Sequence, residues 1–300
     1  MSTATTPLAR PAPDPGAAKD RARRRRRAIG SRSPWFHVFM IPFTLAWITP
    51  MVFVLVVAFR SFDDLVSRGL SALPASLSLE GFATALSAGG IAGSLRNSVI
   101  VTVFAVVASL FLASMAAYAL SRYRIPLRNA ILLVMLAGNL LPPQILLIPV
   151  SKIAEGLGIY DTLLALIVVQ VGFGLGFYTF VLHGFMRSLP DEVFEAARID
   201  GAGPIRIYAQ IVLPLCRPSL AALTALATTW IFNDLIWAMT VLRTETNFPI
   251  TAALLNLQGG FVSQWNVVAA GSIMAAVPTA IVFFIFQKQF VSGLMVGTSK

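Results

Sequence analysis

Six long apolar stretches, separated by shorter polar segments, dominate the chain. A stretch of about 20 residues, at a helical rise of about 1.5 Å per residue, is long enough to cross the hydrocarbon core of a bilayer. Because lipid offers the backbone no hydrogen-bond partners, each stretch is predicted to be a helix, and the lengths exclude the short alternating strands of a membrane barrel. The predicted spans cover residues 38–59, 99–120, 130–150, 162–182, 219–242 and 267–286.

The composition supports the same interpretation. Apolar residues make up 57% of the 300-residue chain and charged residues only 12%, with a mean hydropathy of +0.78. A soluble protein of this length needs more charge to cover its surface. The first apolar stretch is too long for the core of a signal peptide and follows a long polar tail, so we expect it to be a retained span. The sequence therefore predicts an all-α polytopic membrane protein.

The positions of Lys and Arg predict how the spans are oriented. If the N-terminus is cytoplasmic and six spans alternate, most of the 23 Lys and Arg residues lie in cytoplasmic segments. Only five are then external, namely Arg60, Arg68, Arg96, Lys152 and Arg243. Cytoplasmic loops of membrane proteins are enriched in these residues. We therefore predict that both termini are cytoplasmic.

Residues 1–34 form a tail with a composition of its own, rich in Pro, Ala and Arg. It has little apolar surface to bury, so we expect it to be a disordered cytoplasmic segment that precedes a six-span domain over residues 35–300. Five consecutive arginines at 23–27 contribute to the formal net charge of +10. Nucleic-acid binding is the alternative interpretation, but no aromatic residues interleave with the arginines. We expect an anchor near anionic lipid and no nucleic-acid partner.

Enzymatic and metal chemistry find little support. One cysteine, Cys216, and two histidines, His37 and His183, do not make a zinc site, and we predict no metal and no cofactor. A phosphate-binding P-loop needs a Gly directly before its Lys. The four lysines follow Ala, Ser, Gln and Ser, so the chain carries no P-loop. We expect a protein that is not an enzyme and takes its energy from another chain.

The connection between the fourth and fifth spans, residues 184–218, is far longer than a turn requires. We expect Ser188 to cap a first short helix, with Pro190 in its first turn. Gly201 is expected to end this helix, and Pro204 to begin a second one. The result is a bent helix pair with an Ala-rich, sterically thin ridge, which suits insertion into a groove on a partner protein.

The spacing within this connection resembles the EAA loop, EAAxxxGx9IxLP, of the membrane subunits of ABC importers. Its fixed positions are Glu195, Ala196, Ala197, Gly201, Ile211, Leu213 and Pro214. We call residues 184–218 the EAA segment. Other stretches resemble the maltose-type carbohydrate branch of that family, although Phe232 stands where the family commonly has Trp. These stretches cover residues 118–123, 141–149, 156–162, 230–234 and 287–293.

The resemblance implies a type I ABC importer permease fold in a bacterial inner membrane. It also implies several partners: two cytoplasmic ATPase subunits, a second permease that forms a heterodimer, an extracytoplasmic solute-binding protein and a sugar as cargo. Glu195 would contact the ATPase, and Gly201 would permit the bend. The residues expected at this coupling site are Glu195, Ala196, Ala197, Asp200, Gly201, Ala202, Ile211 and Pro214. The alternative is that the segment only caps the bundle.

Polar groups within the predicted spans are candidates for a substrate pathway. On a continuous fifth helix, Trp230, Asn233, Asp234 and Trp237 share one face, where indoles stack on a sugar and polar groups bind its hydroxyls. A carboxylate at this depth is costly unless it faces water or a partner. Further candidates are Asn139, Gln144 and Gln170. The alternatives are interhelical hydrogen bonds for the polar groups and an aromatic belt for Trp237.

Helix-breaking residues mark two further features. Pro142 and Pro143 are expected to break or kink the third span, which frees carbonyl groups and hints at a lined cavity. Gly172, Gly174 and Gly176 in the fourth span are expected to permit close helix packing, with a pore-lining role as the alternative. A secondary transporter or channel is the alternative function. Few intramembrane acids and no evident internal repeat stand against it.

Overall fold

The computed structural model describes residues 34–87, 90–257 and 264–296, and in these ranges all regular secondary structure is helical. The predicted disordered tail lies outside the described residues except for Pro34, which begins a helix. The chain divides into two units, residues 1–53 and 54–300. The described part of the first unit belongs to the apolar helix α2 (Pro34–Ala58), which contains Pro42 and Pro50.

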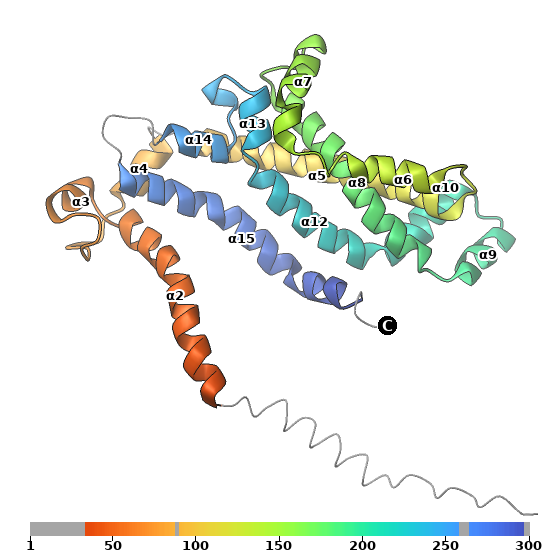
Figure 1. The fold of residues 1–300 in the computed structure, drawn as a ribbon, viewed down its shortest axis with the longest axis horizontal. Coiled ribbons are helices and arrows are strands. Elements are labelled where there is room, and N and C mark those ends of the chain that lie inside the picture. Colours follow the sequence, from red (N-terminus) through yellow and green to blue (C-terminus); the bar gives the residue numbers. More distant parts are fainter. Residues whose placement is uncertain (1–33, 88–89, 258–263, 297–300) are drawn as a thin grey trace, which may run out of the picture. The chain divides into compact units, whose positions relative to one another are not determined.

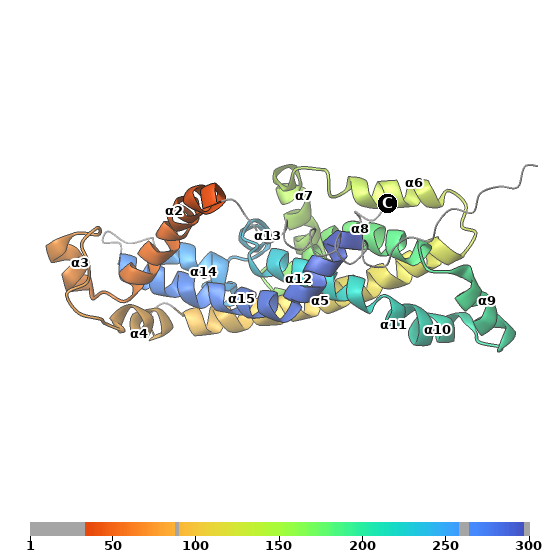
Figure 2. The ribbon, with the colours of Figure 1, turned by 90° about the horizontal axis from the view of Figure 1, so that it is seen from below.

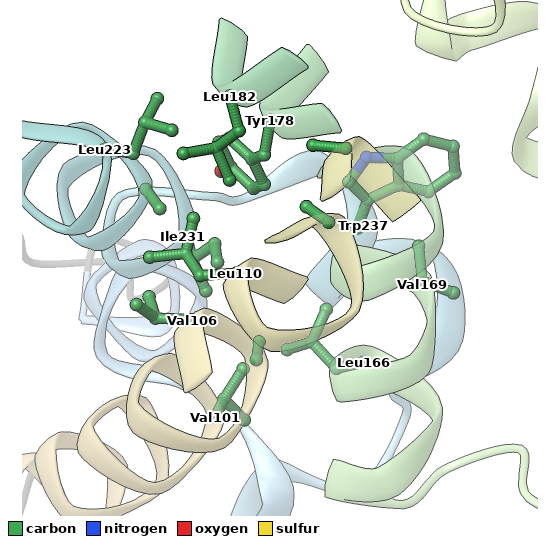
Figure 3. Close-up of a cluster of buried hydrophobic side chains, with 14 of the residues drawn as sticks. Val101, Val106, Leu110, Leu166, Val169, Tyr178, Leu182, Leu223, Ile231 and Trp237 are labelled. Carbon is green, nitrogen blue, oxygen red and sulfur yellow. The ribbon is translucent and has the colours of Figure 1, made fainter. Parts of the chain in front are cut away.

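The second unit contains the remaining long helices, and these pack through apolar and small side chains. They are α5 (Ile91–Arg122), α8 (Leu163–Arg187), α12 (Arg217–Phe232) and α15 (Trp265–Val296). Helix α5 packs against α8 and α12, and α15 packs against α12. Buried Ala105, Ala113 and Ala117 on α5 allow close approach, as small residues do between membrane helices. Figure 3 shows the core that α5, α8 and α12 share.

Four described helices are long and apolar enough to cross a membrane. A fifth candidate is the pair 204–215 and 217–232, which is bent by 73°. The polytopic all-α fold class is therefore confirmed, while the count of six spans stays a prediction. Two of the predicted spans are not continuous helices.

The third predicted span is broken, as its two prolines predict. Helix α6 (Arg128–Ala137) ends before Gly138, and α7 (Pro143–Gly156) begins after an extended Pro142. The fifth predicted span is also broken: α12 ends at Phe232 and α13 begins at Ile236 and ends at Val241. The interpretation of residues 219–242 as one helix was wrong. Helices α7 and α13 contact each other, so the two breaks lie close together (Figure 1).

The glycines of α8 differ in what surrounds them. A Cβ on Gly176 would lie 1.9 Å from the carbonyl oxygen of Met135 on α6, so close packing is confirmed there. A Cβ on Gly172 would meet nothing within 4 Å. The three atoms nearest to a Cβ on Gly174 would belong to the ring of Tyr178 on the same helix. Gly176 therefore lets the backbones of α6 and α8 touch.

Short helices lie at both ends of the α5–α8 pair (Figures 1 and 2). At one end are α9 (Asp191–Ile199), α10 (Pro204–Ile207), the π-helical turn η1 (Tyr208–Val212) and α11 (Leu213–Leu215). At the other are α4 (Glu80–Ser87), the 3₁₀ turn η2 (Glu245–Asn247) and α14 (Ile250–Asn256). Helix α3 (Phe62–Arg68) belongs to the predicted external loop.

One buried arginine organises that external loop. Arg60 is fully buried and pairs with Asp64, one turn along the chain. Its Nη1 donates to the carbonyl oxygens of Gly69, Leu70 and Ala72 at 2.9 to 3.2 Å. The Arg60 guanidinium holds the pKa of the Asp64 carboxyl below its ordinary value. These bonds wrap the loop around a single side chain.

Candidate functional site

A cavity of about 730 Å³ lies where the breaks of the third and fifth predicted spans meet α8. We call it the break cavity. Its lining comes from three regions of the chain, and much of it is polar or aromatic. The lining residues are Gly138, Asn139, Leu141, Pro143, Gln170, Phe173, Gly174, Tyr178, Thr229, Trp230, Ile231, Asn233, Asp234, Leu235, Ile236 and Trp237.

The second break is stabilised by its own polar residues. Asn233 Nδ2 donates to the carbonyl oxygen of Thr229 at 2.8 Å, which satisfies the end of α12. The Asp234 carboxylate accepts a hydrogen bond from the N–H of Ala238 at 3.2 Å, in the first turn of α13. Thr251 on α14 donates to the carbonyl oxygen of Asp234 at 2.7 Å. These bonds replace the helical bonds lost at a break that contains neither Pro nor Gly.

The two tryptophans near this break have different environments. Trp237 is 6% exposed and stacks on Phe173, with ring centroids 4.4 Å apart and planes inclined by 21°. Trp237 and Val169 of α8 belong to the same buried cluster, which Figure 3 shows. Trp230 is 56% exposed, and its nearest ring is that of Phe177 at 5.6 Å. Because the helix is broken between them, the pair does not share one helical face, and only Trp230 offers an open indole.

Gln170 of α8 lies near the Asp234 carboxylate of the second break. Its side chain is buried and approaches Asp234. Its Nε2 nevertheless makes no well-formed hydrogen bond to any part of the chain that the structure describes. A buried amide without a full set of partners is unfavourable unless a ligand or water completes it. Gln170 thus lines the break cavity beside the Asp234 carboxylate, while its Nε2 atom is enclosed by the protein.

The structure gathers six of the seven pathway candidates at the break cavity: Asn139, Gln170, Trp230, Asn233, Asp234 and Trp237. The seventh, Gln144, is exposed on α7 and does not line it. Sequence reasoning did not single out Phe173 or Tyr178 as lining residues. Their spacing from Gln170 along α8 was the available signal, because residues three, four and eight apart share a helical face.

The EAA segment adopts the predicted pair of short helices. Helix α9 ends at Ile199, and Gly201 has a φ of +75°, the left-handed conformation that glycine accepts most readily. The prediction for the start of α9 was wrong. Pro190 is the N-cap and Ser188 belongs to the end of α8, where its hydroxyl donates to the carbonyl oxygen of Phe185.

The two faces of the EAA segment differ. Phe194 and Ala197 of α9 are buried against the rest of the chain, as are Ile207 and Val212. On the other face lie exposed Glu195, Ala196, Asp200 and Gly201, with Ala202, Ile211 and Pro214 partly buried. Two large apolar side chains, Ile199 and Ile205, are 85% and 82% exposed on either side of the bend. Exposed isoleucines around a glycine bend form a surface suited to a protein partner.

Asp161 fastens the loop after α7 to the segment after α13. Its carboxylate accepts hydrogen bonds from the backbone N–H groups of Arg243 and Thr244 at 2.8 and 3.0 Å and from the Thr244 hydroxyl. Asn247 donates to its carbonyl oxygen at 2.7 Å. The hydrogen bond from the Thr244 hydroxyl, followed by those from the two backbone groups, lowers the pKa of Asp161 to about 2. We call this arrangement the Asp161 clasp.

Known proteins resemble this chain in both sequence and fold. Residues 107–295 match the family model of the binding-protein-dependent transport system inner membrane component. The probable ABC transporter permease protein YurM of Bacillus subtilis (strain 168) is 31% identical over 97% of this chain and 95% of its own length. Among the described residues, no group of three or more His, Cys, Asp or Glu side chains could hold a metal ion.

Relatives with named cargo are equally similar. The diacetylchitobiose uptake system permease protein NgcG of Streptomyces coelicolor is 31% identical over 87% of both chains. A chain in the crystal structure of a bacterial ABC transporter for import of the acidic polysaccharide alginate superposes with a TM-score of 0.73. It is 26% identical and covers 86% of this chain and 99% of its own.

Proposed function

The chain belongs to the family of binding-protein-dependent transport system inner membrane components, and we propose that its break cavity is part of the path of a carbohydrate. As an ABC transporter permease subunit, the chain is not itself an enzyme. The uptake of diacetylchitobiose by one relative and of alginate by a structural neighbour supports a sugar as cargo.

The convergence of both helix breaks on one polar and aromatic cavity is the observation that carries this proposal. Trp230 presents an open indole, on which the C–H face of a sugar stacks. Asn139, Gln170 and Asp234 surround it with amide and carboxylate groups that match hydroxyls as donors and acceptors.

Substitution of the lining tests this path. We expect Trp230→Leu, Asn233→Ala and Asp234→Asn each to lower uptake by about tenfold, because loss of one stacking or hydrogen-bonding contact to cargo costs roughly 1–1.5 kcal/mol, and about 1.4 kcal/mol is a factor of ten. The importer should still assemble with its partners. Uptake into vesicles is measured beside ATP hydrolysis stimulated by the loaded binding protein. Asp63→Asn, at an exposed position of α3, is the matched control for Asp234→Asn. Wild-type uptake in all three variants with intact assembly contradicts the proposal.

The EAA segment is proposed to dock onto an ATPase subunit in the cytoplasm. Glu195, Ile199 and Ile205 present a charged and apolar surface that the described part of the chain leaves uncovered. Its two short helices around a glycine bend support insertion into a groove. We further propose a second permease subunit as the dimer partner and two ATPase subunits on the cytoplasmic side. A structural neighbour in complex with a pentasaccharide-bound periplasmic protein supports an extracytoplasmic binding protein as the third kind of protein partner.

Both termini are proposed to be cytoplasmic in a bacterial inner membrane. Reporter fusions test this orientation, because a reporter active only outside distinguishes the two sides. We expect a fusion at Ser76, in the loop built around Arg60, to be external, and fusions at Ala202 and Lys300 to be cytoplasmic. A reversed result at any one of these positions contradicts the six-span topology and leaves the family assignment intact.

A further inference from the structure

Three polar side chains form a stripe along the end of α5 that approaches the EAA segment. Ser114, Tyr118 and Arg122 are spaced by four residues, so they lie on one helical face. All three make polar contacts with residues between 186 and 208. We call them the α5 stripe. Its contacts are neither part of the break cavity nor part of the exposed docking face.

Arg122 holds the entry of the EAA segment. Its Nη2 donates to the carbonyl oxygens of Met186 and Leu189, the latter at 3.0 Å, where α8 ends. Its Nη1 donates to the Asp191 carboxylate at 2.5 Å, and its guanidinium lies 3.8 Å from the ring centroid of Phe194. The Arg122 side chain is 9% exposed and that of Asp191 84% exposed. The carbonyls and the ring, rather than the solvated ion pair, therefore carry most of this contact.

Tyr118 and Ser114 bind the second half of the EAA segment, at α10 and η1. The Tyr118 hydroxyl donates to the carbonyl oxygen of Pro204 at 3.3 Å, at the start of α10. The Ser114 hydroxyl lies 2.7 Å from that of Tyr208 in the π-helical turn. The rings of Tyr118 and Tyr208 also pack together, with centroids 5.5 Å apart. Both arms of the bent helix pair are thus fastened to one helix.

We propose that the α5 stripe is a clamp and that Arg122 is its main positioning residue. The clamp makes the EAA segment move with α5 rather than swing on the turns at 188–190 and 200–203. Helix α5 packs along α8, which carries Gln170, Phe173 and Tyr178 into the break cavity. Movement of the EAA segment is therefore transmitted to the break cavity through α5 and α8. This inference rests on the proposed docking of the EAA segment to an ATPase.

A simpler role for Arg122 is that its positive charge fixes the orientation of the span. Arg122→Lys separates the two roles, because Lys keeps the charge but its single ammonium cannot span these acceptors and stack on Phe194. Arg124→Lys is the matched control. Arg124 lies two residues further on, is exposed, and makes no side-chain hydrogen bond to the described part of the chain.

Hydrogen exchange in the assembled importer is the test. We expect Arg122→Lys to assemble as the wild type does, while the amides of α9 exchange about tenfold faster and solute transported per ATP falls severalfold. Arg124→Lys should match the wild type in both measurements. Equal exchange and equal coupling in the two variants overturns the clamp.

A second variant covers the case in which Arg122→Lys does not assemble. Tyr118→Phe removes one hydroxyl and leaves the ring, and we expect about twofold to threefold faster exchange over residues 205–208. Failed assembly of Arg122→Lys together with unchanged exchange in Tyr118→Phe also overturns the proposal. A different result contradicts the docking proposal itself. In the wild-type protein, the amides of α9 would then gain no protection from exchange when the ATPase subunits are added.

Discussion

In the break cavity, the Gln170 amide lacks a full set of partners among the described residues and Trp230 is largely exposed. At the EAA segment, by contrast, Arg122 of α5 donates to two carbonyls and a carboxylate and packs on an aromatic ring, and only its Nε lacks a partner among the described residues. Both regions interrupt regular helices. The cavity presents an open indole and polar side chains to its interior, whereas the EAA segment is fixed by side chains of α5 that bond to it. A site that binds cargo leaves side chains open to it, whereas a segment that transmits movement is bonded to the rest of the chain.

The predictions below test this contrast, and the largest effect is expected at the close contact of α6 with α8, next to the cavity. Gly176→Ala places a Cβ 1.9 Å from the backbone oxygen of Met135, and a backbone atom of a packed helix cannot move aside cheaply. Separation of α6 from α8 should lower the amount of assembled importer severalfold. Gly172→Ala, which meets nothing within 4 Å, should assemble normally. Equal yields of the two variants in detergent extracts would remove Gly176 as a packing requirement.

The next effect distinguishes the two tryptophans. Trp237→Leu removes a buried ring stacked on Phe173, and we expect the complex to lose about 2–3 kcal/mol of stability, since large core truncations cost this much or more. Trp230→Leu removes an exposed ring and should leave the melting temperature nearly unchanged while uptake falls. Thermal unfolding in detergent checks both. A lower melting temperature for Trp230→Leu than for Trp237→Leu would reverse their roles.

A smaller effect is expected at the bend of the EAA segment. Gly201→Val forces a β-branched residue into a left-handed conformation, which costs roughly 1–2 kcal/mol. Gly203→Val is the matched control, because Gly203 has a φ of −74° and open space around it. We expect only Gly201→Val to weaken co-purification with the ATPase and to lower uptake. Glu195→Lys should also weaken co-purification, by reversing an exposed charge, without changing insertion. Normal co-purification of Gly201→Val and of Glu195→Lys with the ATPase would contradict the docking role of the EAA segment.

The smallest effect is expected in the Asp161 clasp, and it concerns the dependence of unfolding on acidic pH. The pKa of Asp161 lies at about 2, below its ordinary value of 3.8, so the ionised form is favoured in the folded chain. The clasp should therefore contribute stability above about pH 4 and lose that contribution as the pH falls toward 2. We expect Asp161→Asn to flatten the pH dependence of unfolding in this window. The change should be modest because the carboxylate is exposed to solvent. An unchanged acid profile would exclude the clasp as a stabilising contact.

Much of the architecture was predictable because it depends on local pattern. Hydrophobic runs located the long helices, since in lipid an apolar segment must satisfy its own backbone. Pro142 and Pro143 predicted the first break, because proline lacks a donor and clashes in a helix. Gly201 predicted the end of α9 for a similarly local reason. The second break was missed, since Asn233 and Asp234 do not force a helix to end and the surrounding stretch is apolar.

The sequence by itself determined the membrane class, the EAA spacing and most of the polar residues available to a pathway. Only the tertiary structure decided which of them meet: it joined Asn139, Gln170 and Asp234 from three regions, and left Gln144 outside. It also revealed Arg122, which looked like one more cytoplasmic charge. The physical reason is that a polar residue in a helix has many acceptable partners. Packing of α5, α6 and α8 selects which partner lies within hydrogen-bond distance, and periodicity along one chain does not encode that choice.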